Sequence, residues 1–176
     1  MYPYLRLGYT LLKERRSTPI GMFDVHWSEH RAWPWDTDMF GELNNGRILT
    51  LFELGRWGVT QRTGFMGLIF KHKLAFAVAG ASVHYRRRIP IFAKYQMRTH
   101  FLGFDDKFMY VDQSMWMGDV ACNQLLLRAA FTKNRKLFAP SDALDLYGQQ
   151  VASPKLPDWV QNWSDADATR PWPPIV

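Results

Sequence analysis

The sequence has one cysteine, no long apolar run and fewer acidic than basic residues. Cys122 is the only cysteine among 176 residues, which excludes an intramolecular disulfide framework and any CxxC motif for zinc or redox chemistry. No segment approaches the roughly 18 consecutive apolar residues that span a bilayer. Residues 1–16 do not follow the order of a secretory signal either, because the charged residues 13–16 come after the apolar ones. We therefore expect a cytoplasmic protein.

The composition supplies ample core material and an excess of positive charge. Apolar residues make up 47% of the chain and aromatic residues 15%, so intrinsic disorder is excluded as the overall state, and the length favours a single domain. The 22 Lys and Arg outnumber the 16 Asp and Glu, giving a net charge of +6, which fits an anionic partner. A nucleic-acid partner is not expected, because Tyr95 and Phe101 alternate with polar residues as core residues do.

Residues 1–19 predict an N-terminal arm that contains a short amphipathic helix. Leu5, Tyr9 and Leu12 recur in it at helical spacing. One interpretation is that this helix docks on the surface of the domain that follows. The other is that residues 1–16 form a basic helix that lies on an anionic membrane. We expect the first arrangement and do not expect membrane contact.

The strongest helix signal covers residues 44–62. Asn44 is a favoured N-cap residue, and Gly64 is a natural left-handed stop beyond the last turn. Gly55 and Gly58 each cost about 1 kcal/mol of helix propensity, which the close approach of another backbone best explains. The apolar residues of this helix point in nearly every direction, so other elements should enclose it. They are Ile48, Leu49, Leu51, Phe52, Leu54, Trp57 and Val59.

Residue alternation and turn signals predict strands that would wrap around this helix: residues 22–33 and 94–103 alternate in character, residues 74–87 place small residues on one face and larger ones on the other, and turns at 105–107 and 118–119 separate the last strands. The expected strands cover residues 22–33, 74–87, 94–103, 108–117 and 120–133. The pattern indicates an α+β fold in which an antiparallel sheet surrounds one long helix. Residues 20–140 would form this domain, and residues 141–176 a short helix and an irregular tail rich in Pro and Trp, packed on the surface.

Residues 36–48 carry the pattern DTDMFGELNNGRI. An acidic pair, Asp36 and Asp38, precedes Glu42 and the Asn-Asn-Gly entry to the helix. The pattern resembles the loop-and-helix signature of hotdog-fold acyl-CoA and acyl-carrier-protein thioesterases, in which the residue four after the second Asp is usually His. Residues 85–90 and 101–110 are similar to small thioesterase-like proteins of the 4-hydroxybenzoyl-CoA thioesterase group. The resemblance implies a hotdog fold.

The resemblance also implies a catalytic role for Asp38, which stands where the family has its catalytic Asp. A carboxylate there attacks the thioester carbonyl or activates water. The N–H groups of Asn45 and Gly46, at the helix N-terminus, would polarise the carbonyl oxygen. The alternative, that Asp38 only stabilises the loop or the helix end, stays open. Asn44 and Asn45 are either caps or substrate-orienting side chains.

Glu42 is the main departure from the family pattern, since it replaces the usual His. It is either a second catalytic carboxylate, acting as general base or proton shuttle, or an inert substitution in a chain whose activity has changed. Glu53 and Arg56, three apart on the helix, are expected to pair with each other. Glu53 is also a minor catalytic candidate, because a helical Glu has that role in another branch of hotdog proteins.

Three consecutive arginines, Arg86, Arg87 and Arg88, end a predicted strand. They either meet the phosphates of coenzyme A, which arginine binds bidentately, or form a solvated strand end. No metal and no cofactor are expected. The acidic pair alone is a weak metal signal, and His26 and His30 on one strand would lie about 13 Å apart.

The sequence thus predicts an acyl-CoA thioesterase-like hydrolase. By resemblance, we expect a homodimer or a dimer of dimers with sites between protomers, because an open sheet leaves edge strands to protect. The alternative is a non-catalytic hotdog domain that binds acyl-CoA or a lipid without turnover. The carrier of the thioester, CoA or a carrier protein, and the preferred acyl group stay open.

Overall fold

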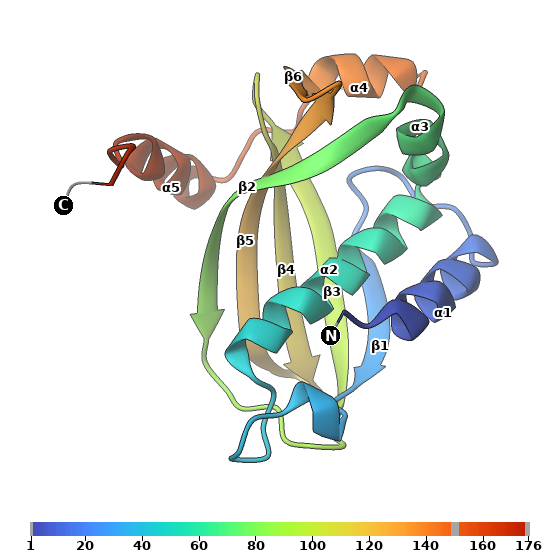
Figure 1. Cartoon of the computed structure of the whole chain (residues 1–176), viewed down its shortest axis with the longest axis vertical. Coiled ribbons are helices and arrows are strands. Elements are labelled where there is room, and N and C mark those ends of the chain that lie inside the picture. The colour runs from blue at the N-terminus through green and yellow to red at the C-terminus, as the bar shows by residue number, and fades with distance from the viewer. Residues whose placement is uncertain (1, 149–151, 175–176) are drawn as a thin grey trace.

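The computed structural model describes residues 2–148 and 152–174, which form a curled antiparallel sheet with a long helix across its concave face (Figure 1). Along the chain the elements are α1 (Tyr4–Arg15), β1 (His26–Arg31), a 3₁₀ turn η1 (Pro34–Asp36), α2 (Asn45–Arg62), α3 (Phe65–His72), β2 (Leu74–Tyr85), β3 (Lys94–Phe104), β4 (Met109–Met117), β5 (Val120–Lys133), β6 (Lys136–Phe138), α4 (Pro140–Leu146) and α5 (Asp158–Ala168). In the described part of the chain, no helix is long and apolar enough to cross a bilayer.

The sheet has the strand order β1-β3-β4-β5-β2, every neighbouring pair is antiparallel, and the short β6 pairs with β5. The alternation along β3 follows the predicted one, with Tyr95, Met97, Thr99 and Phe101 buried toward α2 and the intervening residues more exposed. The α+β hotdog arrangement predicted from the sequence is therefore confirmed.

The central helix α2 begins and ends where its capping residues predict. The side chain of Asn44 accepts a hydrogen bond from the N–H of Arg47 at 3.1 Å, and Gly64 has the left-handed φ of 78°. A Cβ atom at Gly55 would lie 2.8 Å from Oγ1 of Thr99 on β3, and one at Gly58 would lie 3.3 Å from Thr10 on α1. The two glycines therefore let α2 approach the sheet and α1. The atoms that lie close to them belong to side chains, however, and not to another backbone as predicted.

One face of α2 stays uncovered. The sheet covers one side of the helix and α1 another, but Leu49 keeps 39% of its surface exposed, and Glu53 and Trp57 are partly exposed. The prediction that α2 is enclosed on all sides is thus wrong for this chain by itself. The open face lies toward β2, which ends the strand order of the described sheet.

The N-terminal helix α1 docks on α2, but through the face opposite to its apolar stripe. Arg6 and Glu14 lie on the docked face, and the Glu14 carboxylate is 3.2 Å from Nε2 of the buried His26. The stripe residues Leu5, Tyr9 and Leu12 instead keep 60–93% of their surface exposed. The docking of α1 was predicted, but the face through which it docks was not. Charged side chains with buried partners, rather than the apolar stripe, fix the orientation of this helix.

The C-terminal segment is more regular than the predicted tail. It forms α4 and α5, and proline stands at N1 of the first and at the N-cap of the second, where a missing N–H costs nothing. Val160 and Trp163 of α5 pack against Tyr110 and Leu126 on the outer face of the sheet. Residues 149–151 and 175–176 of the predicted tail lie outside the described residues.

His30 makes the stability of this fold depend on pH. It hydrogen-bonds Ser28 at 2.7 Å and stacks on Tyr95, and burial lowers the pKa of His30 to about 4. Between that value and 6.5 the unfolded chain binds a proton that the folded chain does not, so the free energy of unfolding should fall by about 1–3 kcal/mol as pH drops through this range. Urea denaturation at pH 7 and pH 4.5 measures the difference.

The variant His30→Gln should show a smaller loss of stability over the same pH range. The loss of unfolding free energy that remains in this variant should come from His26 and His100, because burial lowers the pKa of each of these groups as well. An unchanged pH dependence in His30→Gln would contradict the assignment to His30.

Candidate active site

A three-residue hairpin loop places Asp38 just before α2. The N–H of Asp38 donates to the carbonyl of Glu42 at 2.9 Å, and the N–H of Gly41 donates to the carbonyl of Asp38 at 3.1 Å. Gly41 has a left-handed φ of 72°. This is a type I turn followed by a left-handed glycine, a common way to close a short hairpin. The loop is therefore held in one shape by its own backbone.

The hairpin places the two predicted carboxylate residues opposite each other in the backbone. Asp38 and Glu42 are opposite each other across the loop, and such residues point to the same side with Cβ atoms about 4.5–5.5 Å apart. Oδ1 of Asp38 accepts the N–H of Phe40 at 2.9 Å. Within the described residues, no hydrogen bond or ion pair engages its other oxygen. Asp38 thus stabilises the turn and still presents a carboxylate oxygen.

Glu42 has a different environment from that of Asp38. Its Oε2 lies 3.1 Å from Nε of Arg88, and the Glu42 side chain is 22% exposed. The Arg88 side chain is 82% exposed, so this ion pair is at the protein surface and contributes little to stability. A cation is nevertheless held next to the loop.

The first turn of α2 follows the loop directly. Helices leave their first N–H groups without intrahelical acceptors, and no hydrogen bond engages those of Asn45 and Gly46 within the described residues. Asn44 acts as the cap, and the carbonyl of Asn45 accepts a hydrogen bond from the Tyr85 hydroxyl at 3.2 Å. The partial positive charge of the helix end favours an anionic oxygen at these N–H groups.

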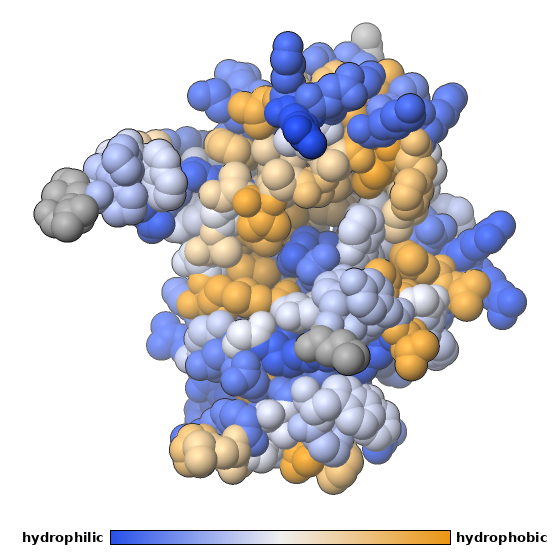
Figure 2. Space-filling model, viewed as in Figure 1, coloured by the Kyte–Doolittle hydropathy of each residue, from blue (hydrophilic) through white to orange (hydrophobic). Residues whose placement is uncertain are grey.

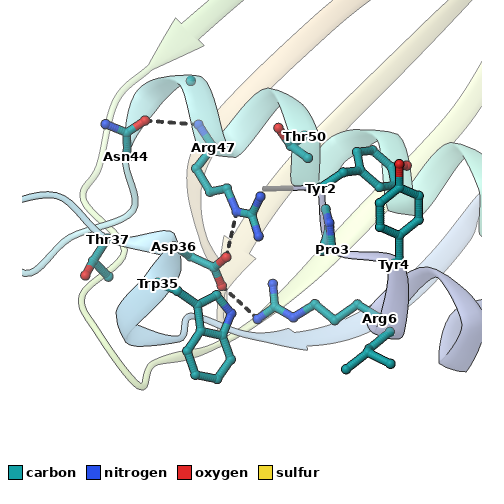
Figure 3. A pocket seen from close by; sticks show the side chains of 12 residues that line it. Tyr2, Pro3, Tyr4, Arg6, Trp35, Asp36, Thr37, Asn44, Arg47 and Thr50 are labelled. Carbon is teal, nitrogen blue, oxygen red and sulfur yellow. Dashed lines mark hydrogen bonds and ion pairs between the residues drawn. The ribbon is translucent and has the colours of Figure 1, made fainter.

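Asp36, which precedes the loop, binds two arginines from the neighbouring helices. Its side chain is fully buried and lies 2.7 Å from Nε of Arg47 and 2.7 Å from a guanidinium nitrogen of Arg6 (Figure 3). It also accepts the N–H of Trp33 at 3.2 Å. Arg47 comes from α2 and Arg6 from α1, so one carboxylate joins both helices to the loop.

A wide hollow opens between α1 and the first turns of α2. Its volume is about 850 Å³. Aromatic side chains and the Asp36 ion pairs form much of its wall, with Tyr2 and Tyr4 on one side and Trp35 near Asp36 (Figure 3). Asn44 and Gly46 of the predicted site also line it. The hollow therefore reaches the N-terminus of α2, where the candidate site begins.

A second, mostly apolar chamber lies between α2 and the sheet. Its volume is about 160 Å³, and Figure 2 shows hydrophobic side chains gathered between β2 and α2. The sheet supplies Phe76, Val78, Phe101, Val111, Leu127 and Ala129, and α2 supplies Glu53, Arg56, Trp57 and Thr60. Such a chamber can hold an aliphatic or aromatic group out of water.

The polar residues of the chamber do not pair as the sequence predicts. Trp57 donates to Glu53 at 3.3 Å, and Arg56 donates to Gln113 of β4 at 2.7 Å. No ion pair joins Glu53 to Arg56 within the described residues. Burial lowers the pKa of Arg56 to about 10, which leaves its guanidinium charged at neutral pH.

The sequence profile of the thioesterase-like superfamily matches residues 32–164, which is most of the chain and includes the loop, α2 and all strands after β1. The chain belongs to the thioesterase-like superfamily. The protein THEM6 of Drosophila melanogaster is 30% identical over 135 residues, covering 74% of this chain and 67% of that protein. THEM6 of Xenopus laevis is 26% identical over 164 residues, covering 91% of this chain and 77% of that one.

A solved thioesterase from Thermus thermophilus, in complex with coenzyme A and zinc, has the same fold. It superposes with a TM-score of 0.60 at 20% identity, covering 70% of this chain and 96% of that one. The profile of this thioesterase-like superfamily begins after α1 and β1. The N-terminal helix is thus an addition to the part that the superfamily profile describes.

In this member of the superfamily, the three consecutive arginines do not gather at one point. Arg88 reaches Glu42, whereas Arg86 lines a hollow of about 280 Å³ beside Arg98. The N–H groups of Arg86 and Arg87 both donate to the carbonyl of Cys122 at 2.9 Å. All three side chains are exposed, but only Arg88 has a contact with the candidate site.

Sequence reasoning missed the ion-paired network around Asp36 in this thioesterase-like chain. It treated Asp36 only as part of a motif, although the structure makes it the fully buried member of the pair. Its partner Arg47 had one local signal, a basic residue in the first turn of α2. Arg6 had none, because it comes from a separate helix. Among residues 2–148 and 152–174, no cluster of three or more His, Cys, Asp or Glu could hold a metal ion.

Proposed function

We propose that this chain hydrolyses acyl thioesters of coenzyme A or of an acyl-carrier protein, with Asp38 as the reacting carboxylate. The observation that carries the proposal is the position of Asp38. Its free carboxylate oxygen stands on a hairpin loop six residues before the N-cap of α2, whose first N–H groups are unpaired among the described residues, in a chain of the thioesterase-like superfamily. The coenzyme A bound to the Thermus thermophilus thioesterase is consistent with the same class of substrate.

The reaction needs few groups, because a thioester carbonyl is reactive. Asp38 either attacks the carbonyl carbon or removes a proton from the water that attacks it. The N–H groups of Asn45 and Gly46 hold the oxygen that becomes negatively charged. When Asp38 activates water, the carbon–sulfur bond then breaks and the leaving thiolate takes up the proton that Asp38 removed. When Asp38 itself attacks, the carbon–sulfur bond breaks to leave a mixed anhydride on Asp38, the thiolate takes a proton from water, and a second water molecule hydrolyses the anhydride to the free acid and restores Asp38. Glu42 is the second carboxylate of the loop and serves as general base or proton shuttle.

The chamber between α2 and the sheet takes the acyl group. At 1.5 Å per residue, Glu53, which lines the chamber, lies about 13 Å along the helix axis from the N-cap Asn44. An acyl group that reaches from the first turn of α2 into this chamber has a medium or long chain. Each methylene group buried there contributes about 0.8 kcal/mol to binding.

Two further parts of the proposal are that exposed arginines bind the phosphates of the carrier and that the edge strand takes part in a dimer. Arg88, which contacts the loop through Glu42, provides positive charge for the phosphates of the carrier, and the exposed Arg86 and Arg87 add positive charge outside the candidate site. The edge strand β2 and the uncovered face of α2 lie next to each other, as they would if a second protomer covered both. A homodimer or a dimer of dimers would then complete the chamber.

One observation favours a second function, binding without turnover. Glu42 stands where related thioesterases usually have His, and its carboxylate is engaged by Arg88. A hotdog domain with this change could retain acyl-CoA and release no thiol. In that case, Glu42→His is expected to bring measurable turnover.

Thiol release from a panel of acyl-CoAs tests the proposed function. The panel contains acetyl-, octanoyl-, palmitoyl- and benzoyl-CoA. We expect turnover. The kcat/KM for acetyl-CoA should be at least about tenfold lower than that for octanoyl-CoA or palmitoyl-CoA, whichever of these two is hydrolysed faster. Saturable binding of palmitoyl-CoA with no thiol release would support the non-catalytic alternative. Absence of both binding and release would contradict the proposal in either form.

A further inference from the structure

The outward face of α1 has the side-chain arrangement of a helix that lies on a membrane surface. At 100° per residue, Leu5 and Leu12 fall in the middle of this face, and Tyr4 and Tyr9 fall at its two margins. Leu5 is 93% exposed, Tyr4 72%, Tyr9 69% and Leu12 60%. Figure 2 shows hydrophobic side chains exposed over α1, at the right of the view. No described residue of this chain covers the face.

The charges on this face all have one sign. Lys13, Arg15 and Arg16 are exposed near its C-terminal end, and within the described residues none of them has an ion-pair partner. The only acidic residue of α1 is Glu14, which is buried on the opposite face beside His26. Apolar side chains flanked by tyrosines and cations, without an acidic residue, complement the headgroups and upper acyl region of an anionic bilayer.

The docked face of α1 fixes this orientation. Arg6 pairs with the buried Asp36, and Glu14 lies 3.2 Å from His26. A Cβ atom at Gly58 of α2 would lie 3.3 Å from Thr10, so the two helices are close along their contact. The exposed leucines cannot turn inward without breaking these buried polar contacts.

We propose that α1 is a membrane-surface helix that binds anionic lipid bilayers through Leu5, Leu12 and the flanking tyrosines and cations. The basic charge of the face complements an anionic lipid surface, and Leu5 and Leu12, which are 93% and 60% exposed, form an apolar strip along the outside of the helix that suits a bilayer better than a single acyl-CoA. Tyr4 and Leu5 also line the hollow beside α2. Docking through α1 therefore brings the hollow that reaches the N-terminus of α2 to the lipid surface.

Co-sedimentation of the full chain with lipid vesicles tests this inference and does not depend on thioesterase turnover. We expect association with phosphatidylcholine vesicles that contain one quarter phosphatidylserine, and weaker association when the salt concentration rises or phosphatidylserine is omitted. The double variant Leu5→Glu/Leu12→Glu should bind at least about tenfold more weakly. Circular dichroism spectra verify that this variant is folded.

A matched variant separates this face from a general effect of charge. Val120→Glu/Leu137→Glu introduces the same two charges at residues that are 49% and 65% exposed on β5 and β6, and it should bind vesicles like the unchanged protein. Equal loss in both double variants, or no vesicle association at low salt, would overturn the inference. So would a concentration-dependent dimer that Leu5→Glu/Leu12→Glu abolishes, since a second copy would then cover the face.

Discussion

Replacing Asp38 by Asn should lower kcat/KM for thioester hydrolysis by about a hundredfold or more and leave the fold intact. The amide has the shape of the carboxylate, and its Oδ1 can still accept the N–H of Phe40 that closes the turn. It cannot act as a base or a nucleophile, however. The measurement is thiol release with the best acyl-CoA of the panel, together with thermal unfolding of both proteins.

Two other carboxylates serve as comparisons for Asp38→Asn. Glu42→Gln removes the second carboxylate of the loop and should reduce turnover less than Asp38→Asn, because Glu42 is also engaged by Arg88. Glu53→Gln removes the carboxylate of the chamber, which lies farther along α2. If Asp38→Asn retains full activity while Glu53→Gln loses it, the reacting carboxylate is on the helix, and the assignment to the loop is wrong.

Local patterns made much of the fold predictable from the sequence. Asn44 and Gly64 mark the two ends of α2 because capping depends on residues adjacent to the helix. The strand β3 follows from clean alternation, which is set by the pleat of the sheet, whereas β4 and β5 are largely buried on both faces and are marked by the turns between the strands. The loop motif resembles that of known thioesterases over a few consecutive residues, so it too could be recognised without a structure.

The parts that sequence analysis missed depend on residues far apart in the chain. The spacing of Leu5, Tyr9 and Leu12 correctly indicated an amphipathic helix, but periodicity does not reveal which face is buried. That face is set by Arg6 and Glu14, whose partners lie on other elements. In the same way, Leu49 completes an apolar pattern around α2, although no element in the described part of this chain covers it fully.

The largest effect on stability is expected from Asp36→Ala, at about 3–5 kcal/mol of unfolding free energy. The substitution leaves the guanidinium groups of Arg6 and Arg47 without the buried carboxylate that both contact at 2.7 Å. It also removes the acceptor for the N–H of Trp33. Urea denaturation followed by tryptophan fluorescence measures the loss.

The surface ion pair of Glu42 with Arg88 provides the comparison for Asp36→Ala. Glu42→Ala should change the unfolding free energy by less than about 1 kcal/mol, because Arg88 returns to water when its partner is removed. Arg6→Ala should have an intermediate effect, since Asp36 keeps Arg47 while α1 loses one of its two buried polar anchors. A loss in Asp36→Ala no greater than that in Glu42→Ala would show that the Asp36 network does not hold α1 and the loop of the candidate site on α2.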